Sequence, residues 1–214
     1  MARSLRLSPA PAGAWRRRGA TPWLALCALA TGGALLAFIG GWGLAWRWQP
    51  ELAAAQPWRA ISAAWVHLSA LHLGANLAGT LLVAALGVAA GCGGRAALAW
   101  ALAWPLTHLA LLAQPALAYY GGLSGVLHAA VAVVAWQLLR AEHGPRRAIG
   151  AALLAGLLVK VLGESPWAGP LRQVPGWNIP VAPLAHATGL AAGLLCALAV
   201  GVGADAGRRP ASRP

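Results

Sequence analysis

The 214-residue chain has little charge, and very little negative charge. Only 9% of its residues are charged and only four are acidic, whereas an ordinary soluble domain has roughly 25% charged residues. Too few charged side chains are present to cover the surface of a soluble fold. The composition therefore argues against a soluble globular protein. The four acids are Glu51, Glu142, Glu164 and Asp205.

Cysteine is also scarce, with three residues, Cys27, Cys92 and Cys196, and no C-x-x-C spacing. An odd number of widely separated cysteines argues against a disulfide framework. No internal repeat is visible either, so a repeat protein is not expected.

Apolar residues are abundant instead, at 59% of the chain. They form six blocks of about the length that an α-helix needs to cross a bilayer, although Pro105 and His108 interrupt the third. The sequence therefore predicts an all-α polytopic membrane protein with six transmembrane helices. The blocks cover about 23–45, 72–91, 96–113, 123–140, 147–163 and 183–203.

The N-terminal region resembles a signal peptide, with "RRR" followed by "PWLALCALA". However, the apolar residues continue through "LLAFIGGWGLAW", which is too long for the apolar core of a signal peptide. We expect an uncleaved first helix. The predicted organisation is a cytoplasmic basic tail at 1–22, a membrane domain at 23–203 and a second cytoplasmic basic tail at 204–214.

The net charge of +12 is explained by topology rather than by a nucleic acid partner. If the N-terminus is cytoplasmic and six helices alternate, twelve of the sixteen basic residues fall on the inner side, as the positive-inside rule requires. These are Arg3, Arg6, Arg16, Arg17, Arg18, Arg95, Arg140, Arg146, Arg147, Arg208, Arg209 and Arg213.

Tryptophan supports the same orientation, because indole rings favour the membrane interface. The first outer loop, about 46–71, is long and apolar, so we expect it to lie in that interface. Seven of the twelve tryptophans fall on the outer side: Trp42, Trp46, Trp48, Trp58, Trp65, Trp167 and Trp177.

Ionisable residues in membrane spans are functional candidates by default. Four of the six histidines map to the outer half of the bilayer, as does Ser124, while His108 is expected to bond a neighbouring backbone or hydroxyl group and His143 to be solvated. Asn76 follows one of the outer histidines by one helical turn. The outer histidines are His67, His72, His128 and His186.

This set has the residue types that acyl transfer needs. A serine hydroxyl requires a base within hydrogen-bond reach, and a neutral imidazole serves near pH 7. We expect His186 to activate Ser124, with His72 and Asn76 as donors to the oxyanion.

Glycines accompany both candidate residues. Gly122 and Gly125 remove bulk around the serine, and the base stands in an H-x-x-G-x-x-x-G pattern with Gly189 and Gly193. Small residues at this spacing let two helices approach closely. We therefore expect the sixth helix to bring its histidine onto the serine.

No acid is tied to this base by spacing. Glu142 and Asp205 fall on the cytoplasmic side, and Glu51 and Glu164 on the outer side have no fixed spacing to the histidine. The interpretation is a Ser–His dyad.

Other interpretations remain open at this point. His128, one turn after Ser124, is a competing base, or it packs on the ring of His186. Metal binding by the outer histidines lacks any recognised ligand spacing. Two non-enzymatic alternatives are a catalytically silent protein that binds helices and a small transporter. The intact Ser/His set argues against the first, and the lack of a charged residue mid-membrane to line an ion path argues against the second.

Three motifs in order resemble those of rhomboid intramembrane serine proteases, most closely the rhombosortase branch. "PWRAISAAWVHLSALHLGANLAG" resembles the first-loop and second-helix signature, "GGLSGVLH" the nucleophile motif, and "AHATGLAAG" the helix that carries the base. The resemblance runs from about Trp58 to Leu195. It implies a six-helix rhomboid-like bundle.

The resemblance implies Ser124 as nucleophile, His186 as base, and His72 with Asn76 as oxyanion donors. Trp58 and Arg59, with His67, would belong to the interfacial loop. His128 stands where ordinary rhomboids often have tyrosine, but "GLSGVLH" is similar to rhombosortases, and so is "LLVKVLGES" with Lys160 and Glu164.

The implied function is cleavage of exported proteins at a C-terminal Gly-Gly and transmembrane tail, with release or transfer of the acyl group to a lipid amine. The alternative is a general rhomboid protease for single-span proteins. No cofactor or metal is implied. The expected partners are membrane-anchored substrates and the bilayer, with the oligomeric state open. The expected location is a bacterial inner membrane, with both termini cytoplasmic and the site on the outer side.

Overall fold

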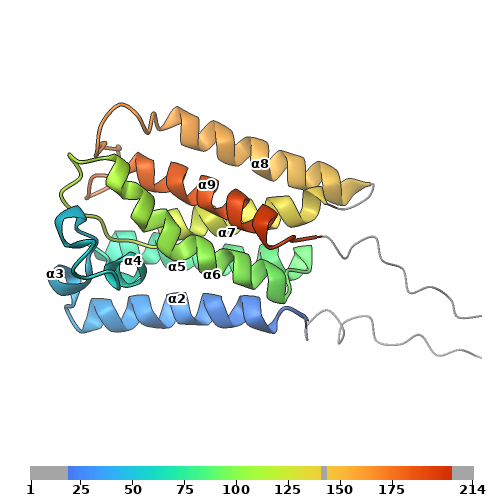
Figure 1. Ribbon diagram of the computed structural model, residues 1–214, viewed down its shortest axis with the longest axis horizontal. Helices are drawn as coiled ribbons and strands as arrows, with labels where there is room; N and C mark the ends of the chain where they lie inside the picture. Colours follow the sequence, from blue (N-terminus) through green and yellow to red (C-terminus); the bar gives the residue numbers. More distant parts are fainter. Residues whose placement is uncertain (1–18, 141–143, 204–214) are drawn as a thin grey trace, which may run out of the picture.

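The computed structural model is an all-helical bundle whose long helices run along one axis (Figure 1). It describes residues 19–140 and 144–203. Within these residues there is no strand, only two isolated bridges. The six long helices are α2 (Thr21–Ile39), α5 (Ala70–Ala90), α6 (Gly94–Leu109), α7 (Ser124–Leu139), α8 (Pro145–Gly163) and α9 (Pro183–Ala199).

Three of these helices are long and apolar enough to span a membrane: α2, α5, and α6 with its continuation to Ala113. Helices α7 and α9 are apolar but shorter. The described residues thus contain six long helices, as the sequence predicts, and three of these have the length and apolar composition needed to span a membrane.

Two helices end well before their predicted boundaries. The first block was expected to reach residue 45, but α2 ends at Ile39 because Gly41 turns the chain with a left-handed φ of +66°, which glycine adopts at little cost. The last helix ends at Ala199 rather than at residue 203. Pro105, expected to interrupt the third block, lies inside α6, which tightens into the 3₁₀ helix η3 (Ala110–Ala113).

The predicted tails lie almost wholly outside the described residues, as does the short segment with Glu142 and His143. The helix of the predicted membrane domain starts at Thr21, two residues earlier than expected.

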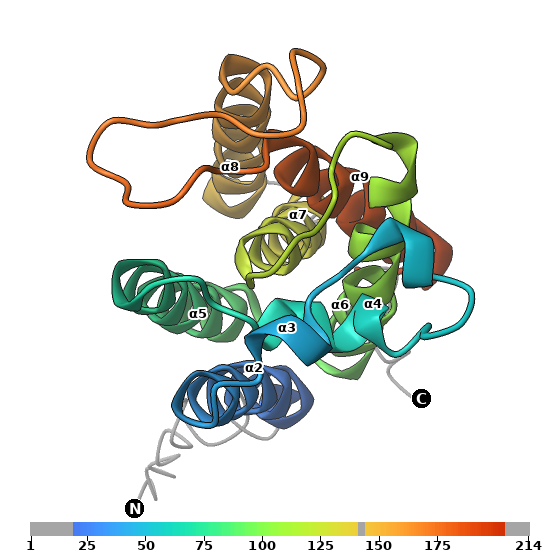
Figure 2. The same ribbon diagram turned by 90° about the vertical axis from the view of Figure 1, so that its left-hand side faces the viewer.

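Helix α7 lies at the centre of the bundle (Figure 2). It packs against α5, α6, α8 and α9, and ten of its sixteen residues are buried. A helix enclosed on all sides can be apolar around its whole circumference. The residue that opens α7 is Ser124.

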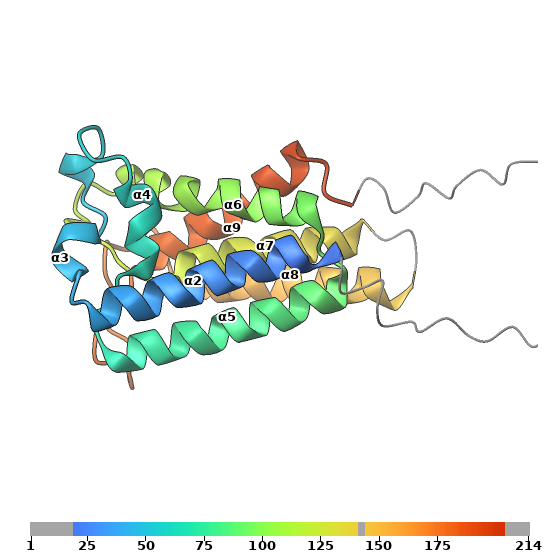
Figure 3. The ribbon, with the colours of Figure 1, turned by 90° about the horizontal axis from the view of Figure 1, so that it is seen from below.

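Buried indoles join the other helices. Trp23 on α2 donates to the carbonyl of Val83 on α5 at 3.1 Å, and Trp100 on α6 donates to the carbonyl of Val126 on α7 at 2.9 Å. The two rings lie 4.8 Å apart between centroids. Figure 3 shows α2 running beside α5, the pair that the first bond joins. These bonds satisfy the polar end of each ring within the apolar core.

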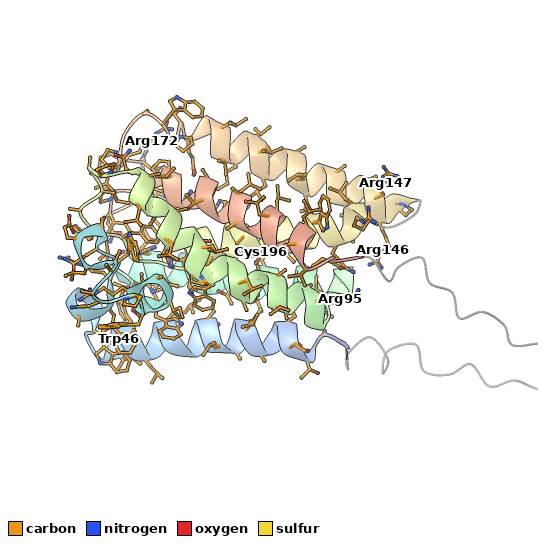
Figure 4. All side chains as sticks on the ribbon, viewed as in Figure 1. Trp46, Arg95, Arg146, Arg147, Arg172 and Cys196 are labelled. Atoms are coloured by element: carbon orange, nitrogen blue, oxygen red, sulfur yellow. The ribbon has the colours of Figure 1, made fainter. Side chains whose placement is uncertain are left out.

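The two ends of the bundle differ in charge (Figure 4). Arg95, Arg146 and Arg147 lie at one end, and Trp46 and Arg172 at the other, which we call the outer end. The start of α2 and the end of α9 lie at the arginine-rich end (Figure 1). The first and last long helices therefore begin and end at the same end of the bundle.

The tryptophans at the outer end have different environments. Trp58 and Trp167 are exposed, as an interfacial residue should be, but Trp48 is fully buried. Trp48 thus lies at the predicted end of the bundle, but its ring packs into the core there instead of facing the bilayer.

The first outer loop folds into short helices: α3 (Gly43–Trp46), η1 (Pro50–Leu52), α4 (Arg59–Ser62) and η2 (Ala63–Trp65). Its buried Arg59 donates to the carbonyl of Arg47 at 2.7 Å and to side-chain oxygens of Gln49 and Gln56 at 3.1 and 2.6 Å. The guanidinium of Arg59 therefore links the beginning of the loop, at residues 47–49, to its middle, at residues 56–59.

Candidate active site

Ser124 is held at the outer end by the segment that precedes it. Trp48 and Tyr120 exchange two backbone hydrogen bonds, of 2.8 and 3.0 Å, and the amide of Gly122 donates to the carbonyl of Ala63 at 2.9 Å. Gly122 has φ of +134°, a conformation that favours glycine. The turn therefore enters α7 in one fixed direction.

His186 lies against this serine. Its Nε2 is 3.0 Å from Ser124 Oγ, within the range of a hydrogen bond. The histidine is in the first turn of α9, so the two helix starts face each other at the outer end.

Glycine permits this approach. A methyl group at Gly189 would overlap the carbonyl oxygen of Gly125, and one at Gly193 would overlap that of Ala129. Helices α7 and α9 thus pack backbone against backbone, as small residues at four-residue spacing allow. The predicted close approach of the two helices is present.

His128 stacks on the base instead of reaching the hydroxyl. Its ring lies 4.1 Å from that of His186 between centroids, with 10° between the planes. Its Nδ1 lies 2.6 Å from the backbone carbonyl oxygen of Ser124, and its Nε2 is buried and has no hydrogen-bond partner among the described residues. Of the two histidines proposed as base, His186 is thus the one at the serine oxygen.

An acid that sequence reasoning left out completes the group. Glu164, the first residue after α8, places Oε2 2.6 Å from His186 Nδ1. Lys160 Nζ lies 2.6 Å from Glu164 Oε1 and 3.5 Å from the same imidazole nitrogen. Glu164 therefore contacts the base although no spacing in the sequence indicates this, because the loop at 164–182 folds back and joins the two helix ends.

Glu164 is ionised in this setting. Burial by itself raises the pKa of a carboxyl, but the hydrogen bond and charge of His186 and then those of Lys160 outweigh it and lower the pKa of Glu164 to about 2. An ionised carboxylate only accepts hydrogen bonds. Nδ1 must therefore carry the proton, which leaves the lone pair of Nε2 for the hydroxyl of Ser124.

The expected oxyanion donors lie beside Gly122, in the turn that precedes the serine. A methyl group at Gly122 would come within 2.7 Å of His72 Nε2 and 3.7 Å of Asn76 Nδ2. Asn76 Nδ2 is buried and has no hydrogen-bond partner in the described part of the chain. Such a donor is costly to leave unsatisfied, and it is suited to an oxygen that arrives with a substrate.

Tyr120 is a further residue that sequence reasoning missed. Its hydroxyl lies 3.2 Å from Ser124 Oγ and 3.2 Å from the carbonyl oxygen of Gly122, and it accepts from the amide of Gly125 at 3.4 Å. Burial raises the pKa of Tyr120, so the hydroxyl stays protonated. Its position four residues before the serine, in "YYGGLS", was the available signal.

These residues line one cavity of about 530 Å³. Its walls are apolar and come from α5, α7 and α8. The loop at 164–182 covers its outer side and reaches the start of α5, where Ser69 donates to Asn178 at 2.8 Å. The apolar wall residues include Leu68, Leu82, Val83, Leu127, Val131 and Leu157.

His67, also a candidate, does not line the cavity. Its Nδ1 lies 3.0 Å from the carbonyl oxygen of Trp65, and its ring packs on His72 with 4.8 Å between centroids. In the described residues no group of three or more His, Cys, Asp or Glu is placed to hold a metal ion. Fully buried His108 bonds the carbonyl of Ala60 through Nδ1 at 2.6 Å, as expected.

The fold and the cavity define an all-helical, multi-pass membrane protein with a serine and a histidine at hydrogen-bond distance. The Rhomboid domain model matches residues 54–202, which is more than half of the chain. The chain therefore belongs to the rhomboid family, whose members are generally intramembrane serine proteases that act on membrane proteins within the bilayer. Among curated proteins, none matches the chain.

Proposed function

We propose that this chain is an intramembrane serine protease in which Ser124 is the nucleophile and His186 the base. The observation that carries the proposal is the 3.0 Å contact between Ser124 Oγ and His186 Nε2, beside a cavity lined by residues of α5, α7 and α8. A hydroxyl and a base in contact are the minimum for nucleophilic catalysis by serine.

The reaction would proceed by acyl transfer. Ser124 Oγ bonds to the carbonyl carbon of the scissile peptide while its proton passes to His186 Nε2. The oxyanion is held by Asn76 and His72. The C–N bond then breaks as the imidazolium returns the proton to the leaving amine. Attack by water, with its proton taken by His186, releases the acyl group as a carboxylic acid and restores the serine.

We further propose a rhombosortase-type substrate: an exported protein with a C-terminal Gly-Gly, an apolar helix and a basic tail. The motif "GLSGVLH" and the pair of Lys160 and Glu164 support this branch. In this case a lipid amine replaces water as the acceptor, and the product is an amide instead of an acid.

The proposed setting is a bacterial inner membrane crossed by all six long helices, with the site on the outer side. Ser124 is the first residue of α7 and follows the segment that pairs with the first outer loop. Arg95, Arg146 and Arg147 lie at the end of the bundle opposite Trp46 and Arg172 (Figure 4). Basic residues favour the cytoplasmic side, so a substrate that has already been exported reaches the site.

The test is cleavage of a model exported protein with this tail, co-expressed with the wild-type chain, Ser124→Ala or His186→Ala. Cleavage is expected with the wild type and is lost in both variants, because the two residues act as a unit. His143→Ala, in the predicted inner loop, is the histidine control. A substrate with Leu-Leu in place of Gly-Gly separates the two branches, since equal cleavage indicates a general rhomboid protease.

A further inference from the structure

Glu164 occupies the position at which an acid can orient the base. Its Oε2 contacts His186 Nδ1 at 2.6 Å, on the opposite edge of the ring from the nitrogen that faces Ser124. The imidazole is thus bonded at both nitrogens. Rotation of the ring about χ2 would break both bonds at once, so the carboxylate fixes the orientation as well as the tautomer.

Lys160 restrains the carboxylate in turn. Its Nζ lies 2.6 Å from Glu164 Oε1, one helical turn away, so each carboxylate oxygen has its own partner. The side chain of Glu164 is 24% exposed, and a charge-assisted bond on both oxygens limits its motion. An unbroken series of side-chain contacts therefore runs from Lys160 through Glu164 and His186 to Ser124.

We propose that Glu164 is a positioning residue that makes this site a Ser124–His186–Glu164 triad, and that Lys160 holds the carboxylate in place. The inference rests on the proposed function and deepens it. No further covalent step is involved: the carboxylate accepts the Nδ1–H bond throughout and stabilises the imidazolium that forms when the serine proton is transferred.

No other described residue can take this part. His128 packs against the face of His186, where it cannot accept a hydrogen bond from the ring edge, and its Nδ1 is engaged with the carbonyl of Ser124. The other acid among the described residues, Glu51, is in η1 of the first outer loop and is exposed.

The charged and titratable groups around His186 predict the direction in which each substitution should shift the pH–rate profile. Glu164 and Lys160 face His186 from α8 and the residue that follows it, His128 from α7, and His72 from α5 across the cavity. The carboxylate favours the imidazolium and the ammonium disfavours it. Removing one or the other should therefore move the acid limb of the pH–rate profile in opposite directions.

The experiment measures kcat and KM for the Gly-Gly substrate against pH, using purified full-length protein in detergent. Glu164→Gln should lower kcat by about 10²-fold with little change in KM, because only the oriented base is lost. Its acid limb should shift to lower pH by about one unit. Lys160→Met should shift the limb to higher pH, and Glu164→Asp should recover part of the lost kcat.

Glu51→Gln is the matched control, since it removes an exposed acid at the same end of the molecule. Wild-type kcat and an unmoved acid limb in Glu164→Gln would overturn the triad, and so would shifts of the same sign in the glutamine and methionine variants. Should Glu164→Gln fail to fold, the acid limb of Lys160→Met and the kcat of Glu164→Asp still test the triad. Cleavage by Ser124→Ala would instead overturn the proposed function itself, and the triad with it.

Discussion

The imidazole rings of His128 and His186 are stacked, with 4.1 Å between their centroids and 10° between their planes. The first ring comes from the centre of the bundle and is fixed by its bond to the carbonyl of Ser124. The second comes from α9 and meets the hydroxyl of the same residue. Ser124 thus contacts both rings. Its backbone carbonyl bonds to His128, and its hydroxyl meets His186, the proposed base.

The stacking predicts different outcomes for the same substitution at the two positions. His128→Tyr should retain measurable cleavage, because a tyrosine ring can also pack on His186. His186→Tyr should be inactive, because a phenol cannot act as a base near neutral pH. Initial rates with the Gly-Gly substrate decide. An inactive His128→Tyr beside an active His186→Tyr would make His128 the base.

The unpartnered amide of Asn76 predicts a loss of transition-state stabilisation. Asn76→Ala and His72→Ala should each lower kcat by roughly 10²-fold, the scale for one oxyanion donor, with a smaller effect on KM. Leu81→Ala on α5, a residue 73% exposed on the lipid-facing side, is the control for that helix. Full activity in both variants would mean that backbone amides suffice.

The contact between α7 and α9 predicts a strict requirement for glycine. In Gly189→Ala the new methyl group would overlap the carbonyl oxygen of Gly125, so α9 must move away and carry His186 with it. A displacement of about 1 Å can cost 10²-fold in rate, and the melting temperature should fall as well. Gly156→Ala on α8, where a methyl group meets no atom within 4 Å, should leave both unchanged. Equal behaviour of the two variants would contradict the close packing.

The ionised carboxylate predicts a pH-dependent contribution to stability. The pKa of Glu164 lies near 2 in the folded protein, against an ordinary value of 4.5. A group with a depressed folded-state pKa stabilises above its unfolded pKa and loses that contribution as pH falls through the folded value. The melting temperature of the wild type should therefore exceed that of Glu164→Gln at pH 7. The difference should shrink between about pH 4.5 and pH 2, and a difference that grew on acidification would be inconsistent with the ion pair.

The charge asymmetry predicts the topology. Reporter domains fused after Pro214 and before Met1 should both be cytoplasmic, while one inserted at Gly169, in the loop at 164–182, should be external. The reason is that Arg95, Arg146 and Arg147 gather at the end where α2 begins and α9 finishes. A C-terminal reporter active only outside the membrane would contradict the proposed orientation of the site.

The sequence by itself determined the local features. Apolar blocks predicted the long helices, because helix length is set by consecutive residues. The spacing of His186, Gly189 and Gly193 predicted a close helix contact, since a four-residue repeat lies on one face. The position of Ser124 at a helix start followed from the change between a glycine-rich stretch and an apolar run.

Only the tertiary structure decided which distant side chains meet. Glu164 and His186 are separated by a loop with no regular period, so nothing in their spacing indicates the 2.6 Å bond between them. Tryptophan is typical of the membrane interface, yet Trp48 is fully buried. The reason is that its backbone pairs with that of Tyr120, which lies 72 positions later in the sequence. Such contacts depend on how the loops return over the bundle, and local propensity does not encode that path.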